Sequence, residues 1–117
     1  MFWGKMMSKK AFLLLAVLFV VGSVAAFAFD GYVAITNDTG FTIFQVFVSH
    51  ESDDFWGEDL LGADVLLDGD TIEIDLFDYP TSIFDVQVID EDGDTYTFFG
   101  VDVAYEDIVV TLDALDL

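Results

Sequence analysis

Alternating carboxylates on one short segment are the sharpest chemical feature of this sequence. The segment reads Asp90-Glu91-Asp92-Gly93-Asp94, and oxygen ligands at this spacing are typical of protein cages for Ca²⁺. It departs from the EF-hand pattern, because its glycine stands at the fourth position rather than the sixth, with no glutamate at the twelfth. The competing interpretation is a hairpin turn in which Asp92 and Gly93 supply positive φ angles. Asp90, Asp92 and Asp94 are therefore candidate metal ligands, and both interpretations stay open.

A second acidic segment surrounds the aromatic pair Phe55-Trp56. A tryptophan held among carboxylates could form the lip of a ligand site. In the competing interpretation Trp56, Leu60 and Leu61 close one end of a hydrophobic core while the acids stay in water. Four carboxylates of this segment are candidate metal ligands as well: Asp53, Asp54, Glu58 and Asp59.

Residues suited to nucleophilic catalysis are few, and we expect no enzyme activity. The chain has no cysteine and one histidine, His50. Ser49 and Ser52 lie near it in sequence, but chain neighbours at a strand end seldom reach the geometry of a catalytic triad. A carboxylate pair could act on a glycosidic bond, yet among 23 acidic residues such a pair always exists and indicates nothing. The sequence predicts no catalytic residue and no cofactor besides Ca²⁺.

Charge is the dominant physical property of the chain. It contains 23 aspartates and glutamates but only three lysines and no arginine, which gives a formal net charge of −20. Every acid follows Ala28 and every lysine precedes it, so the later part of the chain repels itself. Without a basic patch it cannot neutralise phosphates, which excludes nucleic acid as a partner and disfavours anionic membranes. We predict divalent cations or a cationic partner instead.

The N-terminal segment has the three parts of a signal peptide: lysines, a short apolar run and a small-residue cleavage site that ends at Ala28. We predict that residues 1–28 form a signal helix and that residues 29–117 are a secreted or periplasmic domain, away from the membrane after cleavage. The alternative is an uncleaved anchor, since residues 11–29 are long enough to cross a bilayer core of roughly 30 Å. Without cysteine, export brings neither disulfides nor a lipid-modified cysteine.

Beyond Ala28, short alternating runs separated by turn residues predict β-strands. One run is apolar on both faces, as in a central strand, and another pair reads as a hairpin around Asp68-Gly69, a preferred type I′ turn. About seven short strands predict an all-β fold, a small antiparallel β-sandwich. The expected strands are residues 32–36, 41–49 (the central one), 65–67 and 71–76 (the hairpin), 83–89, 95–98 and 108–112.

Three apolar side chains fall on predicted solvent faces of these strands: Phe77, Ile89 and Phe99. They indicate either an interface or a wrong register at those positions, and we favour a wrong register. Separately, Asn37-Asp38-Thr39 matches a glycosylation sequon, which matters only in a eukaryotic secretory pathway.

Much of the predicted domain resembles a group of small exported bacterial proteins of uncharacterised function. The resemblance implies an exported β-sandwich-like domain and assigns neither an activity nor functional residues. Gln87 stands where members of the group often have arginine, in keeping with the loss of basic residues. The similar segments, in the expected order, run from Ile35 to Ile43, from Asp53 to Gly62 and from Phe84 to Tyr96.

The acidity supports three readings of function. In the first, the domain is an exported, non-catalytic binding or structural module whose acidic loops take up divalent cations, with Ca²⁺ the best candidate. In the second, the carboxylates are an adaptation to a salty or acidic habitat, with no specific metal site, and the domain acts in protein–protein docking. In the third, the acids bind a cationic partner such as a basic protein or a polyamine-bearing wall.

Overall fold

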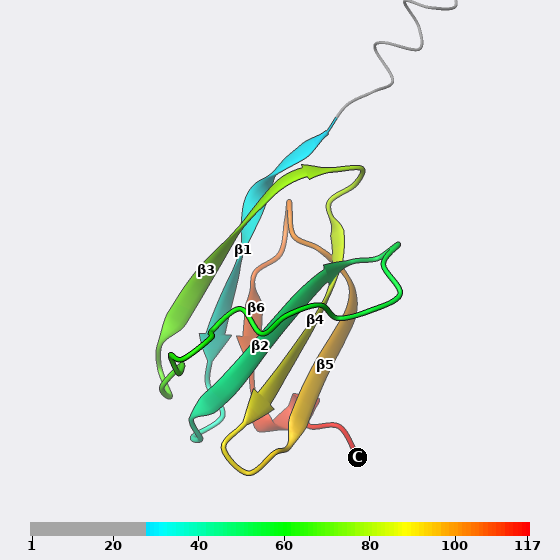
Figure 1. Cartoon of the computed structure of the whole chain (residues 1–117). Coiled ribbons are helices and arrows are strands. Elements are labelled where there is room, and N and C mark those ends of the chain that lie inside the picture. Colours follow the sequence, from blue (N-terminus) through cyan, green and yellow to red (C-terminus); the bar gives the residue numbers. More distant parts are fainter. Residues whose placement is uncertain (1–27) are drawn as a thin grey trace, which may run out of the picture.

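The structure is a computed structural model that describes residues 28–117. It contains two three-stranded sheets packed together as a β-sandwich-like domain (Figure 1). The predicted signal segment, residues 1–28, lies outside the described residues except for Ala28. One sheet has the strand order β3-β1-β6 and the other β2-β4-β5. The elements are β1 (Phe29–Asn37), β2 (Ile43–His50), β3 (Thr71–Tyr79), β4 (Ile83–Asp90), β5 (Thr95–Asp102), β6 (Ile108–Val110) and a 3₁₀ helix, η1 (Leu112–Ala114).

The alternation of the strands places their apolar side chains between the two sheets. In β4, Phe84, Val86 and Val88 are fully buried, as predicted, while the residues between them face outward. Tyr96 of β5 is buried beside them, and Leu76 of β3 closes the opposite side of the core. Because side chains of a strand point alternately to its two faces, this periodicity places these residues of β4 in the core.

Strand number and direction differ from the prediction in two respects. Residues 28–117 contain six strands in place of about seven, and β6 pairs with β1 in parallel, with Ile35 opposite Ile108. The remaining ladders are antiparallel, as expected. Parallel pairing requires a crossover between the two strands, and here the second sheet itself forms part of that crossover, because β2, β4 and β5 lie between β1 and β6 in sequence.

The predicted hairpin around Asp68-Gly69 is wrong. Residues 65–67 do not pair with β3; Leu66 instead exchanges two backbone hydrogen bonds with Ile43 of β2, while β3 pairs with β1. The turn therefore carries the chain from one sheet to the other. Only Gly69 has a positive φ, 90°, and Asp68 does not, whereas a type I′ turn needs both. An Asp-Gly pair sets a local bend, but which strands it joins depends on packing.

The predicted central strand is also placed differently. β2 lies at one end of its sheet, next to β4. Its outer edge is covered by the segment that follows it, because Leu60 donates its amide to the carbonyl of Val46 and Leu66 pairs with Ile43. This segment pairs with backbone groups on the outer edge of β2 that would otherwise be open to another chain, which is a usual way to protect an edge strand.

The outward aromatic residues are real features and not a wrong register. Phe77 is 67% exposed and Phe99 is 75% exposed, whereas Ile89 is half-buried. A bulge in β5 opposite β4 includes Gly100, whose φ is 66°, and bulges of this kind redirect neighbouring side chains. Among the described residues, no helix is long and apolar enough to cross a membrane.

Candidate functional site

The β4–β5 turn is built around a single carboxylate, that of Asp90. The amide of Gly93 bonds to the carbonyl of Asp90, and the amide of Asp90 bonds to the carbonyl of Asp94. Only Gly93 has a positive φ, 82°, so the predicted type I′ turn is wrong. The arrangement matches a three-residue hairpin loop closed by a glycine in the left-handed region. The turn interpretation of residues 90–94 is therefore confirmed, with a different turn type.

Asp90 is only 3% exposed, and its carboxylate accepts three hydrogen bonds. Oδ1 accepts the amides of Asp92 (2.9 Å) and Asp94 (3.0 Å), and Oδ2 accepts the phenol of Tyr96 (2.9 Å). Burial, followed by the hydrogen bond to Asp90 and the charges of the turn, raises the pKa of Tyr96 to about 12. These contacts tie the turn to the core, because Tyr96 is a buried core residue.

The same turn brings three carboxylates together. One oxygen from each of Asp90, Asp92 and Asp94 lies within 4.8 Å of the others, and Asp92 and Asp94 are exposed. Carboxylate oxygens at this separation could bind a cation the size of Ca²⁺, whose ligands lie at 2.3–2.6 Å. The predicted ligands of this turn are thus placed together. Within residues 28–117 no other group of three acidic or histidine side chains meets in this way.

The acids of the second segment are dispersed. Asp59 Oδ1 accepts the amides of Val46 (2.9 Å) and Leu61 (3.0 Å), so this carboxylate holds its loop against β2. Asp53, Asp54 and Glu58 are exposed, and Glu58 does not border the groove that Asp53 and Asp54 line. The four predicted ligands are not gathered as one set, and a metal ion there stays a prediction.

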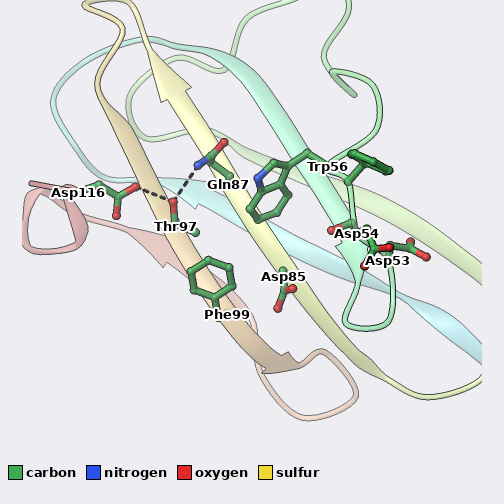
Figure 2. A pocket seen from close by; sticks show the side chains of 10 residues that line it. Asp53, Asp54, Trp56, Asp85, Gln87, Thr97, Phe99 and Asp116 are labelled. Atoms are coloured by element: carbon green, nitrogen blue, oxygen red, sulfur yellow. Dashed lines mark hydrogen bonds between the residues drawn. The ribbon is translucent and has the colours of Figure 1, made fainter.

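Trp56 does not close the core as expected. Leu61 is buried in the core, but Leu60 is exposed and Trp56 lies on the outer face of the β2-β4-β5 sheet, with its ring 6.3 Å from that of Phe99. There the two rings border a groove with a volume of about 350 Å³, seen in Figure 2. The groove is lined by Ser49, Asp53, Asp54, Phe55, Trp56, Asp85, Gln87, Thr97, Phe99 and Asp116.

A chain of hydrogen bonds crosses the floor of this groove (Figure 2). Gln87 Nε2 donates to Thr97 Oγ1 (3.0 Å), which donates to Asp116 Oδ2 (2.6 Å); Thr95 Oγ1 donates to the same oxygen (2.7 Å). The hydroxyl of Thr97, and then that of Thr95, hold the pKa of Asp116 below its ordinary value. Asp116 is therefore a fixed negative charge at one end of the groove.

His50 contacts its chain neighbour Ser52 and also Thr81, which the sequence did not indicate. Its Nδ1 lies 2.7 Å from Ser52 Oγ and accepts the Ser52 amide (3.2 Å), so Nε2 carries the proton and donates to Thr81 Oγ1 (2.7 Å). Thr81 Oγ1 in turn donates to Glu51 Oε2 (3.0 Å). The hydroxyl–imidazole contact resembles part of a triad. However, the Ser52 and Asp53 amides already bond to His50, so they cannot stabilise an oxyanion.

The sequon residue Asn37 is a structural element of the core. It is fully buried, and its Nδ2 donates to the carbonyls of Phe41 (2.7 Å) and Leu66 (3.0 Å). Its Oδ1 accepts both the amide and the hydroxyl of Thr39. A glycan on this nitrogen is incompatible with these contacts in the folded domain.

Many carboxylates outside the β4–β5 turn serve as acceptors for backbone amides. Asp68 accepts the amide of Gly40, Asp85 that of Gly100 and Asp30 that of Asp78. Since residues 28–117 contain no lysine or arginine, backbone N–H groups take the place that basic side chains occupy elsewhere.

Comparison of the chain with protein-family models, with curated proteins and with solved structures finds no match. The resemblance to small exported bacterial proteins therefore stays a prediction.

Proposed function

We propose that the protein is an exported, non-catalytic binding module and that its β4–β5 turn takes up a divalent cation, with Ca²⁺ the best candidate. The observation that carries the proposal is the convergence of three carboxylates within 4.8 Å on one tight turn. The exposed Asp92 and Asp94 supply open oxygens beside Asp90, whose carboxylate is already oriented by backbone amides. A bound cation would offset the mutual repulsion of these charges.

A thermal melt of the protein with and without Ca²⁺ tests this proposal. Calcium sites of extracellular modules bind with Kd values of roughly 10⁻⁴–10⁻³ M. At about 10 mM Ca²⁺ and a Kd of about 1 mM, linkage adds about 1.4 kcal/mol to the free energy of unfolding. For a domain of this size that raises Tm by about 6–11 °C. A background of about 0.5 M NaCl keeps general screening nearly saturated.

Matched variants separate a specific site from general charge relief. The double variant Asp92→Asn with Asp94→Asn removes two exposed carboxylates from the turn, and Glu73→Gln with Asp75→Asn removes two exposed ones from β3. We expect only the first pair to abolish the response to Ca²⁺. Equal responses in both pairs, or no rise in Tm with Ca²⁺ at high salt, contradict the proposal.

A second function is favoured by the hydrogen bonds of Asp90. Its carboxylate is satisfied without a cation, by two amides and a buried phenol. On this reading the acidic side chains hold the loops in place and keep the surface hydrated in a salty or acidic habitat. The domain itself docks to other proteins. NaCl alone would then raise Tm, and Ca²⁺ would add nothing beyond the effect of ionic strength.

A further inference from the structure

The groove on the outer face of the β2-β4-β5 sheet combines exposed aromatic rings with fixed negative charge. Phe55 is 84% exposed and Phe99 is 75% exposed, and both border the groove together with Trp56. Contiguous exposed apolar side chains rimmed by polar residues are a mark of ligand-binding grooves. This surface shares no residue with the β4–β5 turn, so what it binds is a separate question from calcium binding.

The loop that carries Trp56 is anchored at both ends. At its start the amide of Asp53 bonds to the carbonyl of His50, and at its end the amide of Leu60 bonds to the carbonyl of Val46. Asp59 reinforces the second anchor by accepting the amide of Val46. These contacts hold the indole over the sheet in the ligand-free protein, which reduces the ordering cost of binding.

Carboxylates lie on both sides of the aromatic rings. Figure 2 shows Asp116 on one side of Trp56 and Phe99, Asp53 and Asp54 on the other side, and Asp85 next to Phe99. Asp116 uses Oδ2 for its two threonine partners and Asp85 uses Oδ1 for the amide of Gly100. Within residues 28–117 no lysine or arginine is present to pair with either carboxylate.

We propose that this groove binds a linear polyamine, an aliphatic chain with ammonium groups at both ends. The terminal ammonium groups would donate to Asp116 at one end and to Asp85 at the other, in charge-assisted hydrogen bonds. The methylene chain would cover the faces of Trp56 and Phe99, where an ammonium group also gains from the π-electrons of the rings. A metal ion uses the carboxylates but not the rings, and a neutral sugar uses the rings but has no positive charge to offset that of the carboxylates.

Calorimetric titration of the full chain with spermidine in about 0.15 M NaCl measures this binding. Butylamine has one ammonium group and Mg²⁺ has two charges but no apolar chain, so we expect both to bind more weakly than spermidine. In a Trp3→Phe background Trp56 is the only tryptophan, and its fluorescence should change on addition of spermidine but not of Mg²⁺.

Variants with matched controls assign the binding to the groove. Phe99→Ala removes an exposed ring and Asp85→Asn keeps an oxygen for the Gly100 amide, so both should fold. We expect each to weaken spermidine binding by about two- to fivefold, the range of an exposed cation–π or ion pair contact. Phe77→Ala and Asp75→Asn make the same changes on exposed positions of β3 and should leave the affinity unchanged.

Three results overturn the proposal. The first is an equal loss of affinity in the groove variants and in the β3 controls, which would mean general attraction to an acidic surface. The second is displacement of spermidine by Mg²⁺ as effectively as by another polyamine. The third is binding of a neutral disaccharide without binding of spermidine. The variant Asp92→Asn should leave spermidine binding intact, so failure of this proposal is distinguishable from failure of calcium binding.

Discussion

Replacing Asp90 with alanine removes the acceptor that three donors share in the β4–β5 turn. The buried phenol of Tyr96 then lacks a partner, which costs about 1–3 kcal/mol. The amides of Asp92 and Asp94 also lose theirs, and each such loss resembles removal of a helix cap, about 1 kcal/mol. We expect Asp90→Ala to lower the free energy of unfolding by roughly 3–5 kcal/mol, a large fraction of the stability of a small domain.

Urea unfolding followed by far-UV circular dichroism measures this loss, with an unchanged m-value as the sign that only stability changed. Asp92→Ala is the control, because it removes the same charge from the same turn, and this exposed carboxylate is not an acceptor in the turn network. We expect Asp92→Ala to stay within about 0.5 kcal/mol of the parent protein. The difference between the two variants isolates the hydrogen bonds from the relief of charge repulsion.

A double-mutant cycle with Tyr96→Phe assigns the coupling to one contact. If Tyr96 and Asp90 interact through their 2.9 Å hydrogen bond, the double variant should be about 1–2 kcal/mol more stable than the two single effects predict. Additive effects, or an Asp90→Ala variant as stable as Asp92→Ala, would refute the view that Asp90 organises this turn.

Three further predictions concern stability. The free energy of unfolding should fall by about 2–3 kcal/mol between pH 10 and 12, because the pKa of a tyrosine in the unfolded chain is about 10 whereas the pKa of folded Tyr96 is about 12; urea midpoints measured against pH test this. Asn37→Ala should cost about 3 kcal/mol in urea unfolding, because it leaves the carbonyls of Phe41 and Leu66 without their buried donor. Gly93→Ala should cost about 1–2 kcal/mol in the same assay through its φ of 82°, since an added Cβ would contact no atom within 4 Å.

Each of these has a control. Tyr96→Phe should remove the alkaline loss of stability, and a loss of the same size in that variant would assign it to another group. Asn37→Asp keeps the shape of the side chain but lacks the Nδ2 donor. If this variant lowers the free energy of unfolding by less than a surface substitution does, the buried role of Asn37 is contradicted. Gly57→Ala, also at positive φ with open space around it, should cost as much as Gly93→Ala if conformation alone decides.

The sequence by itself determined the local features of this protein. The period-2 pattern predicted the inward residues of β4 correctly, including Phe84 and Val88, because a strand can bury only every second side chain. It also indicated the reversal of the chain at residues 90–94, since a carboxylate followed by glycine favours a turn wherever it occurs. The clustering of Asp90, Asp92 and Asp94 follows from the same short spacing.

Contacts between distant segments were decided only by the tertiary structure. The pairing of Leu66 with Ile43, the parallel β6 and the contact of Trp56 with Phe99 join residues that no local pattern connects. Each depends on which apolar surfaces are buried together and which backbone amides still need an acceptor. The acidic turn was therefore visible in the sequence, whereas the groove and its aromatic wall exist only because two sheets and a loop meet in the folded chain.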